Sequence, residues 1–380
     1  MEKANRDGGF FVLIFVMIER ISNRLRKLNA MYYPQHIFQP PKWLVLGVNN
    51  TCNLHCKMCD VGVNYTQSNF FENLMGTRPV HMPLDLFRHI CDQASHYYPN
   101  VRLGYAFTEP LIYTHLAESL AYARSKKLFT SLTTNGLGLK RWADVLHETG
   151  LSELNVSLDG PPDIHNYIRG NKHSFDLAME GIEALAARNG RIRIGIYCVI
   201  TEWNAGHLTT FLEHLKGKKL HRVGLMHSNF TPQHIADRHN ELFGGLYPAT
   251  ASNVTDTSND AIPLDRLWQD IHEVKRRTWD FPVQFFPDLS SYSMLRQYYT
   301  QPEVFVGKRC MDIFSNLMIK SNGDVIPAHG RCYNLTVGNL YEDNIQKIWN
   351  SGVMAQFRKR LTDHGGLLPA CSRCCSAFVR

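Results

Sequence analysis

Short strand-like runs alternate with helical patterns between residues 43 and 227, and this alternation constrains the fold more than any other feature of the chain. Two parallel strands need a crossover segment between them. Six strands joined by five helices therefore predict an α/β fold with a parallel, barrel-like sheet. The strand-like runs are 43–48, 101–107, 128–133, 153–158, 192–199 and 221–227, and the helical stretches are 84–95, 114–126, 139–148, 175–188 and 205–216.

The length of these units favours an incomplete barrel. A closed eight-fold barrel takes about 250 residues, and the six units take fewer, so we expect a partial (β/α)6 TIM-type barrel followed by a small α+β, cysteine-rich auxiliary-cluster domain. The expected divisions are 1–40 (helical segment), 41–230 (barrel), 231–300 (insert or linker) and 301–380 (auxiliary domain).

The insert is expected to be mixed in structure. Residues 230–263 lose periodicity, and the stretch 249–260 within them is rich in Ser, Thr, Asn and Asp, which predicts a surface loop or insert. A helix is expected at 264–279 and a strand at 283–286.

The amino-terminal segment contains an apolar run at 10–18. A bilayer span needs about eighteen such residues, so this run predicts neither a span nor a signal peptide. From Glu19 onward, Ile21, Leu25 and Leu28 recur at helical spacing between basic residues. We expect a helix docked on the main domain, with peripheral membrane contact through residues 10–28 as the alternative.

Composition narrows the possible partners and the compartment. The chain has 380 residues, 44% of them hydrophobic and 20% charged, which excludes a disordered chain. The 41 basic and 34 acidic residues are spread along the sequence, so we expect no nucleic-acid partner. Ten cysteines in a long chain without a convincing export signal indicate a reducing, cytoplasmic compartment.

The first cysteine cluster directly follows the first strand. Cys52, Cys56 and Cys59 lie there at the spacing C-x3-C-x2-C, at the strand end where barrel enzymes place their chemistry. Three thiolates on a four-iron cluster leave one iron without a protein ligand, and that iron can bind a substrate or cofactor. A zinc site with His55 as the fourth ligand is the alternative.

This loop resembles that of the radical S-adenosylmethionine (SAM) superfamily. The resemblance implies that Cys52, Cys56 and Cys59 are catalytic and hold a [4Fe-4S] cluster whose open iron chelates SAM. It further implies one-electron cleavage of SAM to methionine and a 5'-deoxyadenosyl radical, which abstracts a hydrogen atom from substrate. An external reductant such as flavodoxin or ferredoxin would supply the electron.

A second family landmark follows strand two. Phe107-Thr108-Glu109-Pro110 is similar to the family's Gly-Gly-Glu-Pro, and the resemblance assigns Glu109 to the SAM ammonium group. Thr108 departs from the family's Gly. The alternative for Glu109 is a carboxylate that caps the next helix.

Strands three and four end in similar signatures, Thr133-Thr134-Asn135-Gly136 and Ser157-Leu158-Asp159-Gly160. The resemblance makes Asn135, Ser157 and Arg169 cofactor-binding residues, with the Arg169 fork suited to the methionine carboxylate. The alternatives are turn chemistry for Asn135 and Asp159 and a surface ion pair for Arg169.

A second group of cysteines lies beyond residue 300. This region resembles the SPASM and twitch extensions of radical SAM enzymes, with the hairpin signal 321–327 and a helix at 344–361 between the cysteines. Four thiolates ligate one auxiliary [4Fe-4S] cluster. We expect the ligand set Cys310, Cys332, Cys371 and Cys374, with Cys375 as a rival of Cys332 or a hydrogen-atom donor. A zinc ribbon is the alternative.

Several functions are compatible with these features. By similarity to enzymes with a single auxiliary cluster, the first expectation is oxidation of an alcohol carbon in a sugar, aminocyclitol or similar small metabolite, with the auxiliary cluster accepting an electron. The alternatives are modification of a ribosomally made peptide (cross-link, epimerisation or thioether formation) and sugar epimerisation. A non-catalytic electron carrier or zinc-binding scaffold is the alternative from a different class.

Overall fold

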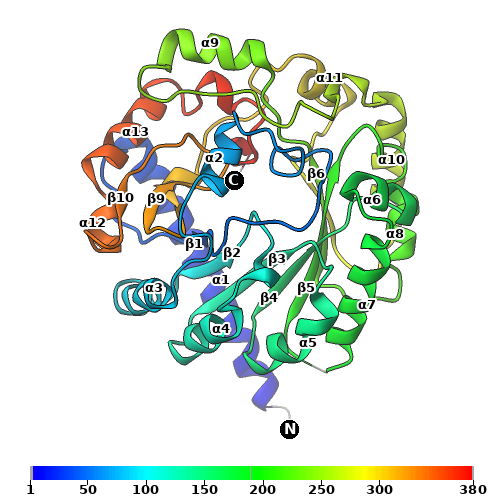
Figure 1. Ribbon diagram of the computed structural model, residues 1–380, viewed down its shortest axis with the longest axis horizontal. Helices are drawn as coiled ribbons and strands as arrows, with labels where there is room; N and C mark the ends of the chain where they lie inside the picture. The colour runs from blue at the N-terminus through cyan, green and yellow to red at the C-terminus, as the bar shows by residue number, and fades with distance from the viewer. Residues whose placement is uncertain (1–2, 189, 379–380) are drawn as a thin grey trace.

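The fold is built on one sheet that runs through the whole molecule (Figure 1). The computed structural model describes residues 3–188 and 190–378. Strand order is β10-β9-β8-β1-β2-β3-β4-β5-β6-β7. Neighbours from β8 to β7 pair in parallel, while β9 and β10 are antiparallel. The strands are β1 Trp43–Leu46, β2 Arg102–Tyr105, β3 Phe129–Thr134, β4 Glu153–Ser157, β5 Arg193–Ile200, β6 Arg222–His227, β7 Val283–Phe286, β8 Asn316–Ile319, β9 Asp324–Pro327 and β10 Gly338–Asn339.

Helices lie around the outside of this curved sheet (Figure 1). They bury apolar side chains together with those of the strands in one large core. The helices are α1 Lys3–Tyr32, α2 Asn69–Met75, α3 Leu84–Tyr97, α4 Leu116–Ser125, α5 Leu139–Glu148, α6 Pro162–Arg169, α7 Ser174–Ala186, α8 Leu208–His214, α9 Gln233–Phe243, α10 Leu264–Arg276, α11 Tyr292–Thr300, α12 Ile345–Trp349 and α13 Gly352–Asp363.

The expected α/β class and parallel sheet are confirmed. All six expected strands and five expected helices are present, with ends that shift by a few residues, and β7 matches the strand expected at 283–286. Two expectations are wrong. The region 230–263, expected to be a loop, contains α9, and the helix expected at 344–361 is interrupted at Asn350 and Ser351, where Ser351 caps a new helix.

The cysteine-rich region continues the barrel sheet. Strand β8 pairs with β1 in parallel, from Trp43 opposite Asn316 to Leu46 opposite Ile319. The hairpin expected at 321–327 is formed by β8 and β9, and Gly323 has a φ of +85° at its turn, a conformation that glycine adopts without strain. The boundary at residue 300 remains a prediction, because the sheet crosses it without interruption.

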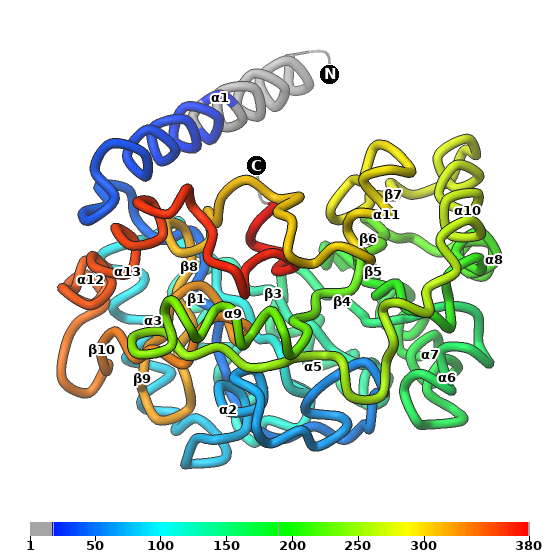
Figure 2. Tube along the Cα trace, turned by 90° about the horizontal axis from the view of Figure 1, so that it is seen from above, coloured from blue at the N-terminus to red at the C-terminus, as the bar shows by residue number. Residues whose placement is uncertain are grey.

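The amino-terminal helix α1 is longer than expected and leans away from the body of the molecule (Figure 2). Its carboxyl-terminal part is docked, since the buried Arg26 side chain donates hydrogen bonds to the carbonyls of Phe314 (2.5 Å) and Pro40 (2.7 Å). Among the helices described here, none combines the length and apolar character needed to cross a bilayer.

A core substitution in β8 should destabilise the barrel and the cysteine-rich region together. Leu317 is fully buried, and Leu317→Ala should lower the free energy of unfolding by about 3 kcal/mol. Leu242→Ala on α9, where the side chain is 66% exposed, is the control and should change it by less than about 0.5 kcal/mol. Urea unfolding followed by circular dichroism measures both. Two separate transitions, with only one shifted by Leu317→Ala, would contradict a single cooperative sheet.

Candidate active site

The first cysteine loop lies between β1 and α2, at the carboxyl edge of the sheet. Burial raises the pKa of the Cys56 thiol to about 12, against the lowering effect of the Arg169 charge and with smaller increases from Cys59 and Cys52. Backbone packing fixes the loop. A Cβ on Gly62 would lie 2.4 Å from the carbonyl oxygen of Cys56, and the amide of Lys57 donates to the carbonyl of Ile168 on α6 (2.9 Å).

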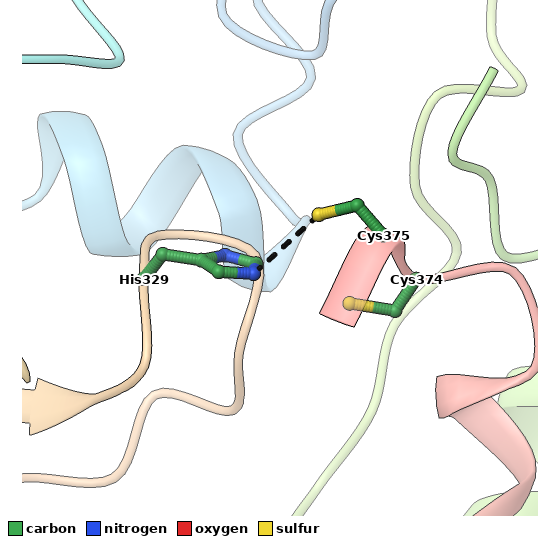
Figure 3. A group of neighbouring side chains, drawn as sticks. All are labelled: His329, Cys374 and Cys375. Carbon is green, nitrogen blue, oxygen red and sulfur yellow. Dashed lines mark hydrogen bonds between the residues drawn. The ribbon is translucent and has the colours of Figure 1, made fainter. Parts of the chain in front are cut away.

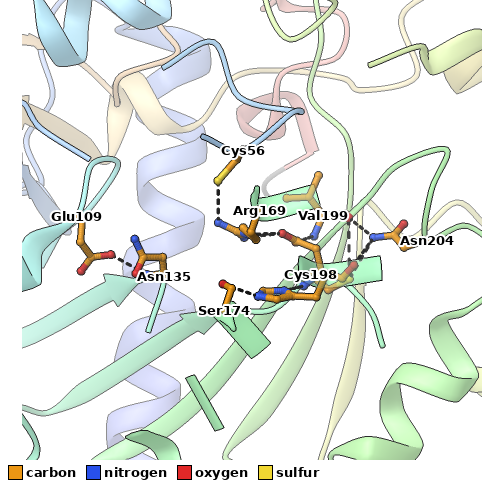
Figure 4. A network of polar contacts seen from close by, with 10 residues as sticks. Cys56, Glu109, Asn135, Arg169, Ser174, Cys198, Val199 and Asn204 are labelled. Atoms are coloured by element: carbon orange, nitrogen blue, oxygen red, sulfur yellow. Dashed lines mark hydrogen bonds and ion pairs between the residues drawn. The ribbon is translucent and has the colours of Figure 1, made fainter. Parts of the chain in front are cut away.

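A buried ion pair supports this loop from below (Figure 4). Asp159, which follows β4, pairs with Arg169 at the end of α6: Nη2 and Nε lie 2.5 and 2.6 Å from Oδ2. Arg169 also donates to the Cys56 sulfur (Nη1 to Sγ, 3.6 Å). The second Asp159 oxygen, Oδ1, accepts from the Val199 amide on β5 (2.8 Å). Arg169 is therefore engaged below the cysteine loop, and its assignment to a SAM carboxylate remains a prediction.

Glu109 and Asn135 form the opposite wall. The buried Glu109 carboxylate accepts hydrogen bonds from the amide of Leu111 (3.0 Å), the hydroxyl of Thr134 (2.7 Å) and the amide of Asn135 (2.8 Å). Burial raises the pKa of this carboxyl, and the three hydrogen bonds partly oppose that shift. The bond to Leu111 caps a short 3-10 helix, so the capping role weighed for Glu109 is present.

Asn135 also reaches the cysteine loop. Its side-chain amide donates to Oδ1 of Asn53 (2.8 Å), while its own oxygen accepts from the amide of Leu137 (3.0 Å). Asn135 thus serves as a turn residue and joins Glu109 to the loop. Oε1 of Glu109 accepts from Leu111 and Thr134, whereas Oε2 accepts only from Asn135. A carboxylate oxygen can accept two hydrogen bonds, so Oε2 retains acceptor capacity for a cationic group.

Ser157 ends β4 at the same edge of the sheet and is half-buried. Within residues 3–188 and 190–378, its hydroxyl has no hydrogen-bond partner. A ligand oxygen could therefore bind there without displacing an existing contact. The cofactor-binding roles of Glu109, Asn135 and Ser157 remain predictions.

The second thiol group surrounds a single cavity. Cys310, Cys332, Cys371 and Cys374 all line it. Burial raises the pKa of Cys310 well above the usual thiol range, with further increases from Asp312 and from the charges of Cys374, Cys371 and Cys332. The four sulfurs are thus neighbours, as the expected ligand set requires.

Cys375 occupies a different position beside this cavity. Its exposed side chain points toward His329, with Sγ 3.6 Å from Nε2 (Figure 3). The ligand atoms of His329, Cys374 and Cys375 lie within 4.8 Å of one another. His329 was not predictable as a site residue, because a lone histidine in an Ala-His-Gly turn has no distinctive spacing.

Phe107 links the two thiol groups. It follows β2, has a φ of +82°, and packs in one apolar cluster with Cys59. Its ring lies 5.9 Å from the ring of His329, measured between centroids. The first cysteine loop follows the carboxyl end of β1, whereas Cys310 precedes β8, which pairs with β1 in parallel, and Cys332 follows the antiparallel β9. The two groups therefore approach Phe107 from opposite ends of the sheet.

The donor sets fit iron–sulfur clusters. One loop offers three thiols and the cavity offers four, and thiolates are the ligands that iron–sulfur clusters use. The fit is one of ligand number and type.

Comparisons with known proteins agree with this architecture. Residues 47–215 match the profile of the Radical SAM superfamily, and residues 310–375 match that of an iron-sulfur cluster-binding domain, SPASM. The chain is 30% identical to Fe-coproporphyrin III synthase from Methanosarcina barkeri over 201 residues. That alignment covers 51% of this chain and 47% of the synthase. The chain spans about half the length of the curated relatives it matches.

Solved structures share the fold at low identity. Streptococcus suis SuiB bound to precursor peptide SuiA superposes with a TM-score of 0.60 and 17% identity, covering 92% of this chain and 75% of that one. AnSMEcpe with bound AdoMet and a peptide superposes with a TM-score of 0.55 and 18% identity, covering 88% of this chain and 86% of that one.

The fold and the two thiol groups define a radical SAM enzyme. The chain belongs to the radical SAM superfamily and has a C-terminal SPASM iron–sulfur region. Its cofactors are therefore SAM and a [4Fe-4S] cluster, together with iron–sulfur binding in the SPASM region.

Removing the buried ion pair should loosen the first cysteine loop. Asp159→Asn leaves the buried Arg169 without its counter-charge, which costs about 3–5 kcal/mol. We expect a lower free energy of unfolding and faster loss of iron to a chelator. Asp163→Asn, an exposed carboxylate in the first turn of α6, is the matched control and should retain both properties. Equal iron loss in the two variants would show that the pair does not support the loop.

His227, at the end of β6, should make the protein sensitive to acid. Burial lowers its pKa to about 3, and a hydrogen bond joins its Nδ1 to the Tyr299 hydroxyl (2.8 Å). Below about pH 6.5 the unfolded chain binds a proton that the folded chain excludes, so stability falls with pH. From pH 7 to 5, this residue should remove about 2 kcal/mol from the free energy of unfolding.

His227→Gln should remove that part of the pH dependence, whereas His272→Gln, at an exposed position, should leave it unchanged. Urea unfolding of both variants at pH 7 and pH 5 measures the difference. An unchanged pH dependence in His227→Gln would contradict the burial argument.

Proposed function

We propose that this enzyme modifies a peptide, using SAM chemistry at the first thiol group and a single auxiliary cluster at the second. The proposal depends most on the cavity that the second group lines. None of the described residues around it is Asp or Glu. Its polar side chains away from the thiols are neutral or basic: Asn69, Asn229, Thr231, Thr250, Ser252 and Arg331.

This lining discriminates between the candidate substrates. An aminocyclitol has ammonium groups, which carboxylates usually bind, and the cavity offers none. Amides and hydroxyls match the donors and acceptors of a peptide backbone, and they match sugar hydroxyls as well. Two similar folds were solved with peptides bound, SuiB with its precursor peptide and AnSMEcpe with a peptide, which favours a peptide substrate. Peptide modification is therefore favoured over oxidation of a sugar or aminocyclitol, our first expectation.

Arg331 is the residue best placed to orient the peptide. Its guanidinium carbon lies 4.3 Å from the centroid of the Phe70 ring, and its Nη1 is 3.5 Å from the carbonyl oxygen of Asn229. Stacking on the ring leaves the planar edge of the guanidinium available for a carbonyl or carboxylate of the substrate.

Residues at the carboxyl edge of the sheet would hold SAM. Bound to an iron–sulfur cluster, SAM supplies a radical that removes a hydrogen atom from a carbon of the substrate. Cys52, Cys56 and Cys59 would ligate that cluster. Glu109 would accept from the ammonium group of SAM through Oε2, and Ser157 would bind one of its oxygens. Asn135 would hold Glu109 and the loop in register.

Cys332 is our choice for the fourth ligand of the auxiliary cluster. It lines the cavity with Cys310, Cys371 and Cys374, whereas Cys375 is exposed beside His329. Four thiolates saturate one cluster, so its role would be electron transfer or support of the fold.

A substrate assay tests the proposal. Reduced, anaerobic enzyme with SAM is incubated with a random-sequence peptide pool or with a mixture of sugars and aminocyclitols, and 5'-deoxyadenosine is measured. We expect the peptide pool alone to increase it above the substrate-free rate. An increase with the sugars alone would overturn the proposal.

Cysteine variants control this assay. Cys56→Ala should abolish 5'-deoxyadenosine formation, whereas Cys91→Ala, a buried cysteine of α3 outside both groups, should retain it. Retained formation in Cys56→Ala would contradict the role of the first loop.

A further inference from the structure

We propose that the outward face of α1 binds the surface of an anionic membrane. From Met17 to Tyr32 this face is apolar. Its side chains recur every three or four residues and are 43–67% exposed: Met17, Ile21, Leu25, Leu28 and Tyr32. A stripe at that spacing on a globular protein usually faces the core, but here it faces away from it.

The inner face of the helix explains why the stripe stays outside. Arg26 and Asn29 are buried and polar, and both donate hydrogen bonds to backbone carbonyls. Arg26 donates to the carbonyls of Phe314 and Pro40, and Asn29 donates to those of Tyr33 (2.9 Å) and His36 (2.8 Å). Rotating the stripe inward would break these bonds and leave buried carbonyls unpaired, which is costly.

The charged residues beside the apolar face of α1 indicate which partner binds there. Arg20, Arg24 and Lys27 are exposed on the same helix, and Glu19 is the only acidic residue in the sequence from 17 to 33. A helix with an apolar face between basic side chains lies in the interface of an anionic bilayer. A second copy of the same helix would bring like charges together, so self-association is disfavoured.

Position and flanking residues fit a membrane surface. The coloured part of the helix lies outside the barrel in Figure 2, which leaves its exposed side chains accessible to a surface. Tyr33 and Phe38 extend the exposed apolar surface beyond the helix end, and aromatic residues are common at membrane interfaces. The helix is docked on the SPASM region, since Arg26 bonds Phe314, so that side of the enzyme would face the lipid.

Vesicle flotation tests the proposal with the full chain loaded with its clusters. We expect the protein to float with phosphatidylglycerol vesicles, and less with phosphatidylcholine vesicles or at high salt. Ile21→Glu/Leu25→Glu should reduce flotation about tenfold or more, because two apolar anchors are lost. Leu242→Glu/Leu246→Glu, which places the same charges at exposed apolar positions near α9, should float like the parent.

Folding controls and a charge variant accompany this test. Iron content and circular dichroism show that each variant is folded. Arg20→Gln/Arg24→Gln/Lys27→Gln should lose the preference for phosphatidylglycerol. No flotation by the parent, or equal flotation by Ile21→Glu/Leu25→Glu, would overturn the proposal. So would a dimer on size exclusion that this variant abolishes, because a second copy of the chain would then cover the stripe.

Discussion

The buried pair between Asp159 and Arg169 is the interaction on which the site depends. It joins the end of β4, the amide of Val199 on β5 and the sulfur of Cys56 in one chain of contacts. The loop buries Cys56 in a small apolar cluster with Leu54, Met58 and Ile168. The ion pair supports that cluster from the barrel side. An ion pair removed from water is strong when both partners are fully bonded, and here the carboxylate has a donor on each oxygen.

Continuity of the sheet brings the two thiol groups together. Because β8 pairs with β1, the SPASM cysteines are attached to the strand that precedes Cys52. Phe107 then fills the space between Cys59 and His329. Two groups about 250 residues apart in sequence thus approach Phe107 from opposite ends of one sheet.

Much of this was predictable from the sequence. Strand-like runs that alternate with helical patterns predicted the six parallel strands, because hydrophobic periodicity leaves a strong local signal. The pairing of β8 with β1 was not predictable, since register between distant strands depends on the folded partner. Helix α9 was missed because its sequence, QHIADRHNELF, is polar on most positions and follows Pro232 in a region without clear periodicity. The ion pair of Asp159 was not predictable, because an Asp-Gly pair indicates a turn whether or not the fold brings an arginine beside it.

Iron and sulfide counting after anaerobic purification tests the central claim most directly. If the two thiol groups hold separate four-iron clusters, the parent should contain about eight irons per chain, and about four should remain when Cys52, Cys56 and Cys59 are all replaced by Ala. About four should also remain when the alanines are placed at Cys310, Cys332, Cys371 and Cys374 instead. About four irons in the parent, all lost in either variant, or stoichiometric zinc in place of iron, would contradict the account.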